Sequence, residues 1–443
     1  MMSLLKRLIP SWAMDQYHRG LSWVAAIKYG HPSKQMVVIG VTGTNGKTTT
    51  SYLIAKALEA SGEKTGCTTT AIFKVADREW LNTKKMTMLG RFALQKTLCE
   101  MVDAGCRYAV VETSSQGVLQ HRHENIAYDV AVFTNLTPEH IEAHGGFENY
   151  KQAKLAFFRY AASLPRKVLN GKTIPRLAIV NRDRDFSADF AKTGFRDVVW
   201  YGAGKCVEGD ICAKNIEEKN WVSTFTVDGS PATMHLPGMV NVENAMAAVA
   251  VATSLGMSRE AVLKKLSDVS GVPGRFERIN EGQDFSVIVD YAPEPASLEK
   301  VYEAISKISH TRLIHVLGSA GGGRDVWRRK VLGEMAARKA AVVIVTNEDP
   351  YDEDPQKIIR QVSDGARSVG REGVQILEIL DRREAIVRAM NEARPGDLIL
   401  LTGKGCEQAI MGPNGSKTPW DEREVARDAI RGILSASNSH VSH

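Results

Sequence analysis

A glycine-rich turn with a single lysine is the stretch of this sequence best suited to chemistry. It reads Gly43-Thr44-Asn45-Gly46-Lys47-Thr48 and lies between an apolar, β-branched run at residues 36–41 and a segment with helical spacing. In that setting the backbone N–H groups of the turn and of the helix N-terminus point at phosphate oxygens. The lysine supplies a cation to the β and γ phosphates, and the threonine hydroxyl is a ligand for Mg²⁺. The pattern therefore predicts a nucleotide phosphate loop.

Further stretches rich in acids, bases and hydroxyls follow this loop in a fixed order. They are ETSSQGVLQHR at 112–122, FTNLTPEHIEAHG at 133–145, YKQAKLAFF at 150–158, MVNVENAMAA at 239–248, GRFE at 274–277, VDYA at 289–292, GSAGGGRD at 318–325, EDPYDEDP at 348–355, GKGCE at 403–407 and DEREVARDAI at 421–430. Together with TGTNGKTTT, this series resembles the Mur ligases, enzymes that add amino acids to the peptide of peptidoglycan precursors. The resemblance covers about residues 36–432 and is strongest to the MurE type, which adds the third residue.

The resemblance implies ATP-dependent amide formation with ADP as a product. A substrate carboxylate attacks the γ-phosphate to give an acyl phosphate, and an amine then displaces phosphate. Because the first step joins two anions, it needs dense positive charge and metal ions. ATP and Mg²⁺ are therefore the implied cofactors, and a muropeptide-type acceptor and a free amino acid are the implied substrates.

The resemblance also implies roles for individual residues. Catalysis is expected from Lys47, Glu112, His140 and Lys154, and Mg²⁺ ligation from Thr48, Glu112, His140 and a carbamate on Lys154. Nucleotide contacts are expected from Gly43, Thr44, Asn45, Gly46, Lys47, Thr48, Thr49, Asn244, Arg275, Asp290 and Arg324. Contacts to the acceptor or the amino acid are expected from Thr87, Ser114, Arg122, Glu348, Asp349, Tyr351, Lys404 and Glu407. Taken alone, Glu112 and Arg275 would each be read as structural salt-bridge partners, and His140 as a helix cap.

The sequence also departs from the MurE pattern. Only about 35 residues precede the ATP domain, too few for the N-terminal domain of roughly a hundred residues that holds UDP, so we expect that domain to be lacking. Where diaminopimelate-type enzymes have Asp-Asn-Pro-Arg, this chain has Glu348-Asp349-Pro350-Tyr351. The arginine that would clamp a distal carboxylate is missing, and the neighbouring acids favour a cationic side chain such as that of lysine. The histidine of GKGHE is replaced by Cys406, which we expect to be a packed thiol rather than a reactive one.

The elements that must position these residues form an α/β pattern. Apolar runs separated by helical segments predict a doubly wound parallel sheet of the P-loop ATPase type, followed by a smaller Rossmann-like domain. Short alternating runs predict a small antiparallel patch at residues 205–236. Strands are expected at 36–41, 107–112, 129–134, 176–181, 285–291, 313–318, 341–346 and 397–402. The expected domains are a helical segment at 1–35, a central domain at 36–272, a C-terminal domain at 273–434 and a flexible tail at 435–443.

Composition bounds the remaining possibilities. Hydrophobic residues make up 43% and charged residues 24%, which is typical of a soluble globular protein. The net charge is +6 with both signs spread along the chain, so no basic tail indicates nucleic acid. No apolar run reaches about 18 residues, so no membrane-spanning helix is expected. Six cysteines without a CxxC pair predict free thiols in a reducing, cytoplasmic compartment, and we expect a monomer.

The N-terminal 35 residues allow two interpretations. They interleave leucine, isoleucine and tryptophan with lysine, arginine and histidine, which predicts two short amphipathic helices broken near Pro10. In the first interpretation the apolar side chains pack on the body of the protein. In the second, residues 1–30 make a weak peripheral contact with an anionic membrane surface.

The chemistry leaves alternatives open as well. A UDP-linked dipeptide is the leading acceptor, but a ligase of the amidating type acting on a lipid-linked precursor, or one of the folylpolyglutamate or poly-γ-glutamate type, would use a similar fold. Amidating subunits usually carry a four-cysteine ribbon, which is absent, and folate relatives usually read GTNGKGS where this chain has Thr48-Thr49. A different class of protein, a nucleotide-binding module without ligase activity, would show no ATP turnover dependent on acceptor and amino acid.

Overall fold

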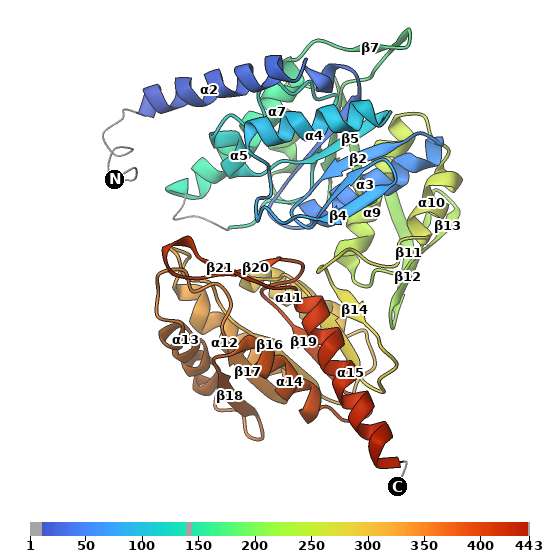
Figure 1. Cartoon of the computed structure of the whole chain (residues 1–443). Coiled ribbons are helices and arrows are strands. Elements are labelled where there is room, and N and C mark those ends of the chain that lie inside the picture. Colours follow the sequence, from blue (N-terminus) through green and yellow to red (C-terminus); the bar gives the residue numbers. More distant parts are fainter. Residues whose placement is uncertain (1–10, 139–143, 442–443) are drawn as a thin grey trace. The chain divides into compact units, whose positions relative to one another are not determined.

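The computed structural model describes residues 11–138 and 144–441, and the chain divides into two compact units (Figure 1). The first comprises Met1–Glu217, Thr224–Met234 and Met239–Val269. The second comprises Glu218–Ser223, His235–Gly238 and Ser270–His443. The division after Val269 lies close to the boundary expected between residues 272 and 273.

The first unit is built on one large sheet with parallel strands at its centre. β1 (Val37–Thr42) pairs in parallel with β5 (Tyr108–Glu112) on one side and with β6 (Val130–Phe133) on the other. β9 (Leu177–Asn181) and β10 (Asp197–Gly202) continue the parallel series beyond β6. The residues of β1, β5, β6 and β9 are all buried, as expected for strands covered on both faces. The strands predicted at 36–41, 107–112, 129–134 and 176–181 are confirmed.

The edges of this sheet carry strands that only partly follow the prediction. The expected patch at 205–236 is present as β11 (Ile211–Lys219), β12 (Val222–Val227) and β13 (Ser230–Met234), but it extends the large sheet instead of standing apart, and β11 joins β10 in parallel. At the other edge, β2 (Thr65–Thr68) pairs antiparallel with β3 (Ile72–Val75), which pairs antiparallel with β4 (Arg78–Leu81). The order is β13-β12-β11-β10-β9-β6-β1-β5-β2-β3-β4. A separate small hairpin joins β7 (Val168–Leu169) to β8 (Lys172–Thr173).

Helices cover both faces of this sheet (Figure 1). One face carries α4 (Arg91–Asp103), α5 (Ser115–Leu119), α7 (Phe147–Ser163) and α8 (Ser187–Ala191), and its core includes Leu98, Phe157, Phe158 and Phe190. The other face carries α3 (Lys47–Leu58), α9 (Met239–Ser254) and α10 (Arg259–Ser267), with a short 3₁₀ turn at Glu59–Ser61, whereas the 3₁₀ turn at Pro32–Lys34 packs against α4.

α2 (Ser11–Lys28) packs along α4, and the residues before it lie outside the described part of the chain. Ala25 and Ala26 are fully buried, and the Ser22 hydroxyl donates to the Glu124 carbonyl at 2.8 Å. Trp23 and Ile27, on another side of the helix, are 58% and 47% exposed. The helix therefore packs on the body of the unit as the first interpretation requires, yet it also presents apolar side chains to solvent.

The second unit has a six-stranded sheet in the order β14-β15-β19-β16-β17-β18. β14 is antiparallel to β15 and the other pairs are parallel. Helices α11, α12 and α13 pack on one face, and α14 and α15 on the other. The strands are β14 (Glu277–Ile279), β15 (Ser286–Val289), β16 (Leu313–Leu317), β17 (Val342–Thr346), β18 (Gln375–Ile379) and β19 (Leu398–Leu401), with a hairpin of β20 (Ala409–Met411) and β21 (Lys417–Pro419). The helices are α11 (Pro295–Ile305), α12 (Trp327–Lys339), α13 (Pro355–Ser368), α14 (Arg382–Glu392) and α15 (Glu422–Val441), with a 3₁₀ turn at Pro413–Gly415.

One expectation is corrected by this structure. α15 continues to Val441, so residues 435–441, expected to form part of a flexible tail, are helical. Cys206 and Cys212 lie side by side with Cα atoms 6.3 Å apart, a separation that a disulfide can span, and their expected state as free thiols stays a prediction. Among the described residues, no helix is long and apolar enough to cross a membrane.

Candidate active site

The phosphate loop connects β1 to α3, and its glycines are required by close packing. Gly43 has a φ of 154°, and a Cβ there would lie 1.9 Å from the Thr134 hydroxyl oxygen. Gly46 has a φ of 79°, and a Cβ there would lie 2.6 Å from Oδ1 of Asn244. L side chains rarely adopt such backbone angles, so glycine is the residue that fits both positions. The turn can therefore bring its backbone N–H groups close to a phosphate.

The segment after β6 fixes the shape of the loop. The Thr44 amide donates to the Asn135 carbonyl at 2.8 Å, and the Asn45 amide donates to Asn135 Oδ1 at 2.9 Å. Lys47 Nζ donates to the Thr44 carbonyl at 2.6 Å, which folds the lysine back over the loop. Thr49 is buried in the first turn of α3. The predicted loop residues thus form one structure that can hold nucleotide phosphates.

Glu112 lies at the centre of a buried group of hydroxyls beside the loop. It ends β5, and because β1 and β5 are parallel neighbours with Val41 opposite Glu112, its carboxylate reaches the start of α3. The Thr48 hydroxyl donates to the two carboxylate oxygens at 3.1 and 3.0 Å. Thr70 donates to the same carboxylate through its amide at 2.7 Å and its hydroxyl at 3.0 Å, and the Thr70 hydroxyl contacts that of Thr87 at 3.1 Å. The structure therefore joins Thr48 of the phosphate loop and Glu112 of the ETSSQGVLQHR motif to Thr87, a predicted substrate contact that lies outside the quoted motifs.

This donor set suits a magnesium ion. Thr48 and Glu112 offer hard oxygen ligands, and Mg²⁺ in nucleotide sites is typically held by one or two carboxylates together with phosphates and water. The described residues contain no group of three or more His, Cys, Asp or Glu side chains placed to hold a metal by themselves. His140, the predicted ligand of a second metal, lies outside the described residues.

Lys154 projects from α7 to the same loop. Its side chain is buried, and Nζ donates to the Gly43 carbonyl at 2.6 Å and lies 4.4 Å from the centre of the Tyr150 ring. The Tyr150 hydroxyl in turn donates to Thr44 Oγ1 at 3.2 Å. These contacts place Lys154 beside the phosphate loop, as the predicted role requires, while its carbamylation stays a prediction.

His144 joins this group, although the sequence reasoning assigned it no role. Its Nε2 lies 3.1 Å from the Ser115 hydroxyl, and its ring packs edge-on against Tyr150 with centres 5.0 Å apart. Burial lowers the pKa of His144, and the nearby Lys154 lowers it further. The available signal was the second histidine of EHIEAHG, but sequence spacing alone did not show which histidine faces the loop. Ser114, predicted to contact substrate, caps α5 by accepting from the Gly117 amide at 3.1 Å.

Asn244, on α9, also packs against the loop. Its Oδ1 accepts a hydrogen bond from the Thr50 hydroxyl at 3.0 Å, and its Nδ2 donates to Asn241 Oδ1 at 3.2 Å. This position next to Gly46 is compatible with the predicted nucleotide contact. The contact itself stays a prediction.

In the second unit, Asp290 organises the GRFE turn. Its Oδ2 accepts from the Phe276 amide at 2.6 Å and its Oδ1 from the Ala292 amide at 2.8 Å. Burial raises the pKa of Asp290, and Arg275 opposes that shift. The Arg275 guanidinium lies 4.5 Å from the centre of the Tyr291 ring. Asp290 therefore has a clear structural task beside the ribose contact predicted for it.

Lys404 forms the centre of a buried cluster after β19. Its ammonium donates to Asp349 at 2.8 Å, to Glu407 at 2.7 Å and to the Ala409 carbonyl at 2.8 Å. Burial alone lowers the pKa of Lys404, but Glu407 and Asp349 outweigh it and the net pKa is raised. An ammonium has three donors, and all three contact protein atoms here. This arrangement favours a positioning role for Lys404 over the predicted direct contact with substrate.

Tyr351 and Arg324 lie together near this cluster. Burial alone lowers the pKa of Arg324, but Tyr291, Tyr351 and Glu294 outweigh it, and the net pKa is raised. Tyr351 has a φ of 53°, and a Cβ on Gly322 would lie 2.6 Å from the Tyr351 ring. Burial raises the pKa of the neighbouring Glu348. The structure thus brings Arg324, predicted to contact nucleotide, to the residues predicted to contact the amino acid.

Two further observations complete the placement of the predicted residues. Arg122 donates to the Met88 carbonyl at 2.6 Å and to Gln120 Oε1 at 2.5 Å. Met88 directly follows Thr87 in the sequence. Cys406 is buried, and burial raises the pKa of its thiol to about 11, in agreement with a packed rather than a reactive thiol.

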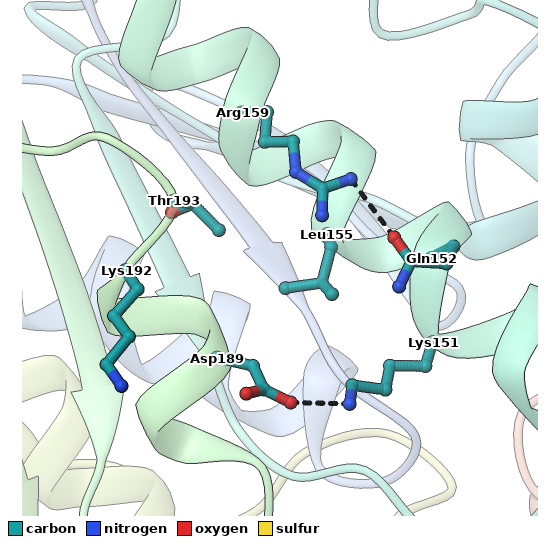
Figure 2. Close-up of a pocket in the computed structure, with 7 residues that line it drawn as sticks. All are labelled: Lys151, Gln152, Leu155, Arg159, Asp189, Lys192 and Thr193. Atoms are coloured by element: carbon teal, nitrogen blue, oxygen red, sulfur yellow. Dashed lines mark hydrogen bonds and ion pairs between the residues drawn. The ribbon is translucent and has the colours of Figure 1, made fainter.

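A pocket of about 290 Å³ lies between α7 and α8, away from these residues (Figure 2). Lys151 forms an ion pair with Asp189 at 2.5 Å, and Arg159 donates to Gln152 at 3.1 Å. None of the predicted site residues lines the pocket, so we do not assign the reaction to it. Its lining consists of Lys151, Gln152, Leu155, Arg159, Asp189, Lys192 and Thr193.

Comparison with known proteins defines the class of this fold and site. Residues 41–252 match the Mur ligase middle domain, and residues 274–405 match the Mur ligase glutamate ligase domain. The chain belongs to the Mur ligase family, whose members are ATP-dependent amide-bond ligases that form ADP.

Individual relatives make the similarity more specific. A UDP-N-acetylmuramyl-tripeptide synthetase from Roseiflexus sp. (strain RS-1) is 37% identical over 433 residues, which is 95% of this chain and 84% of the relative. A UDP-N-acetylmuramoyl-L-alanyl-D-glutamate–2,6-diaminopimelate ligase from Geobacillus kaustophilus (strain HTA426) is 36% identical, over 96% of this chain and 84% of its own. A solved structure of a UDP-N-acetylmuramoyl-L-alanyl-D-glutamate–2,6-diaminopimelate ligase is 29% identical in sequence and has a TM-score of 0.61. The match covers 90% of this chain and 79% of that protein's chain.

Proposed function

We propose that this Mur ligase joins an amino acid to the peptide carboxylate of a UDP-linked muramoyl dipeptide. This proposal is supported by the chain of hydrogen bonds from Thr48 through Glu112 and Thr70 to Thr87. It connects the nucleotide loop directly to a residue predicted to contact the acceptor. An acceptor carboxylate held near Thr87 would lie on the same side of the sheet as the γ-phosphate, which is the geometry that phosphoryl transfer needs.

The roles of the chain's own residues follow from this arrangement. Lys47 and the N-terminus of α3 would bind the phosphates, and Thr48 and Glu112 would hold Mg²⁺, which neutralises charge on the phosphates when bound. An acceptor carboxylate oxygen attacks the γ-phosphorus, and ADP leaves. The amine of the amino acid then attacks the acyl carbon, phosphate leaves, and the amine loses a proton. Lys154 would support this group from α7.

The decisive experiment measures products. Phosphate release from ATP is followed with UDP-linked dipeptide and a panel of amino acids, and the peptide product is identified by mass spectrometry. We expect release only when both acceptor and amino acid are present, with one added residue per phosphate. Turnover that ignores the acceptor, or no turnover with any member of the panel, would favour a nucleotide-binding module without ligase activity.

We also propose that the added amino acid is lysine-like rather than diaminopimelate. Arg328 and Arg329 are the nearby arginines considered as replacements for a clamp at Tyr351. Both are buried in ion pairs, with Glu294 and Glu353 respectively. Loss of a clamp on a buried carboxylate costs about 2–4 kcal/mol, or roughly 30- to 700-fold in relative efficiency.

Competition between L-lysine and meso-diaminopimelate in one assay measures this preference directly. A preference for diaminopimelate would reject the lysine assignment. It would assign the clamp to Arg324, which Arg324→Lys would then weaken. Arg338→Lys, an exposed arginine on α12, is the matched control.

A cytoplasmic, monomeric enzyme without nucleic-acid partners fits this function, since ATP and UDP-linked precursors are cytoplasmic substrates. The contact of residues 1–30 with a membrane stays a prediction. The exposed Trp23 and Ile27 of α2 motivate it, and the packing of the opposite face of α2 on the unit provides the alternative.

A further inference from the structure

His315 is a polar residue inside β16, an otherwise apolar strand of the second unit. The strand reads Leu-Ile-His-Val-Leu, and all five of its residues are buried. β16 lies between β17 and β19 in the sheet, and His315 has no exposed surface. A buried imidazole destabilises a fold unless both of its ring nitrogens find hydrogen-bond partners. An apolar side chain would avoid that requirement, so the partners of His315 show what the histidine contributes.

Two hydroxyl groups provide these partners. Nδ1 lies 2.8 Å from the Tyr302 hydroxyl on α11, and Nε2 lies 2.9 Å from the hydroxyl of Thr402, which directly follows β19. A neutral imidazole has one donor and one acceptor nitrogen, and a hydroxyl can be the partner of either. Burial and the charge of Arg382 lower the pKa of His315 to about 3. The ring is therefore neutral, and it links α11 to the end of β19.

Thr402 is also held through its backbone. Its amide donates to the Val316 carbonyl at 3.0 Å, and its carbonyl accepts from Nη2 of Arg382 at 2.7 Å. The same Arg382 donates to the Asn347 carbonyl, just beyond β17, at 3.0 Å. Amide, carbonyl and side chain of Thr402 are thus each fixed by a separate group. The contact with His315 is the one of these three that involves the side chain.

The turn that leaves Thr402 carries residues predicted to contact the amino acid. A Cβ on Gly403 would lie 2.3 Å from Oε2 of Glu348, so the backbone of the turn passes close to this acid. Lys404 follows and donates to Glu407 at 2.7 Å. Because the chain departs from Thr402, the orientation of Thr402 determines where the turn places Lys404 and Glu407.

We propose that His315 is a positioning residue for the addition of the amino acid, and that it acts with the hydroxyls of Tyr302 and Thr402 to fix the turn at 403–407. His315 would contact neither substrate nor nucleotide. Displacement of a binding group by about 1 Å can reduce a rate by about a hundredfold, so a fixed turn matters for the reaction. The part of Glu407 in binding the amino acid rests on the proposed function, whereas the ordering of the turn does not.

Hydrogen exchange tests the ordering of the turn independently of ligation. Thr402→Val removes the hydroxyl with little change in shape, and exchange at 403–407 should become at least about fivefold faster, while exchange at 342–346 should not change. Thr402→Ser keeps the hydroxyl and should exchange like the wild type. Thr346→Val is the matched control. Thr346 ends β17, and its buried hydroxyl has no hydrogen-bond partner among the described residues.

Steady-state kinetics then tests the link to the amino acid. Thr402→Val should raise the KM for the amino acid at least about fivefold, which corresponds to about 1 kcal/mol, the typical net contribution of one hydrogen bond. The KM for the acceptor should stay within about twofold, and Thr346→Val should change neither value. Tyr302→Phe should raise the KM for the amino acid less than Thr402→Val. Adding it to Thr402→Val should have no further effect, because both hydroxyls act through one imidazole.

Unchanged exchange at 403–407 in Thr402→Val, or exchange that is equally faster throughout the second unit, would overturn the positioning role. A Thr402→Ser chain that behaves like Thr402→Val would overturn the part assigned to the hydroxyl. Faster exchange at the turn with an unchanged KM for the amino acid would overturn the link to the reaction. A chain that shows the expected exchange but ligates no amino acid, even as the wild type, would instead contradict the proposed function.

Discussion

Replacement of Lys404 by methionine distinguishes a positioning lysine from one that binds substrate. The Lys404 side chain is completely buried and its ammonium contacts Asp349, Glu407 and a backbone carbonyl at 2.7–2.8 Å. Breaking a buried ion pair typically costs about 3–5 kcal/mol. Glu407 is 17% exposed, so water recovers part of the loss and we expect the lower end, about 3 kcal/mol. Methionine fills a similar volume, so the cavity contribution stays small.

Urea unfolding monitored by hydrogen exchange in peptides spanning residues 398–411 measures the cost in the unit concerned. Lys417→Met, an exposed lysine on β21, should change the stability by no more than about 0.5 kcal/mol. We also expect a raised KM for the amino acid, because Glu407 loses the group that holds it. A Lys404→Met chain with wild-type stability and only a raised KM would refute the positioning role and restore a direct substrate contact.

Three further outcomes are expected. Lys154→Ala should reduce turnover severely while ATP binding persists, and short carboxylates should rescue it in part if a carbamate is needed; full activity of the variant in a phosphate-release assay would contradict the role. For Asp397, burial alone raises the pKa, but hydrogen bonds from Arg312 and the Arg394 amide outweigh burial, and the net pKa is lowered. The ionised Asp397 therefore stabilises the fold at pH values above its ordinary pKa of 3.8. This stabilisation is lost as the pH falls through the lowered pKa of the folded state. Asp397→Asn should therefore be about 2 kcal/mol less stable at pH 7, with a gap that narrows below about pH 4 in urea unfolding; a constant gap would argue against this linkage. Removal of residues 1–28 should lower the melting temperature without changing sedimentation with anionic vesicles, and a loss of vesicle binding would instead support the membrane contact.

The central strands of both sheets were predictable because their sequences are short, buried and β-branched. Runs such as 36–41 and 341–346 leave little choice of structure in an α/β pattern. The strands that escaped prediction include β4 and β18, which lie at the ends of their sheets. β4 reads Arg-Glu-Trp-Leu, and β18 reads Gln-Ile-Leu-Glu-Ile with exposed residues. Such segments become strands because a neighbouring strand offers hydrogen-bond partners, and sequence periodicity does not record that neighbour.

The phosphate loop and Glu112 were predictable from motifs, but the use of each polar group was not. The sequence placed Lys404 and its partner Glu407 in one substrate motif, whereas Asp349 comes from a separate segment that only the fold brings beside the lysine. Arg91 belongs to none of the motifs, so its convergence with Arg122 on Gln120 left no signal in the sequence. The motifs therefore indicated the chemistry of the site, but they did not show which partner each charged side chain contacts.

The close approach of Gly322 to Tyr351 has a consequence for protein engineering. A side chain at 322 would collide with the tyrosine ring, and Tyr351 itself occupies a left-handed backbone conformation that favours glycine or asparagine. A library that randomises position 351 alone will therefore place new side chains in a space that fits a flat aromatic ring. The left-handed backbone angle at this position also disfavours β-branched residues. Varying residues 322 and 351 together lets the side chain at 351 and the space beside it change in the same variant. We therefore expect paired libraries to alter the proposed amino-acid preference more readily than libraries at position 351 alone.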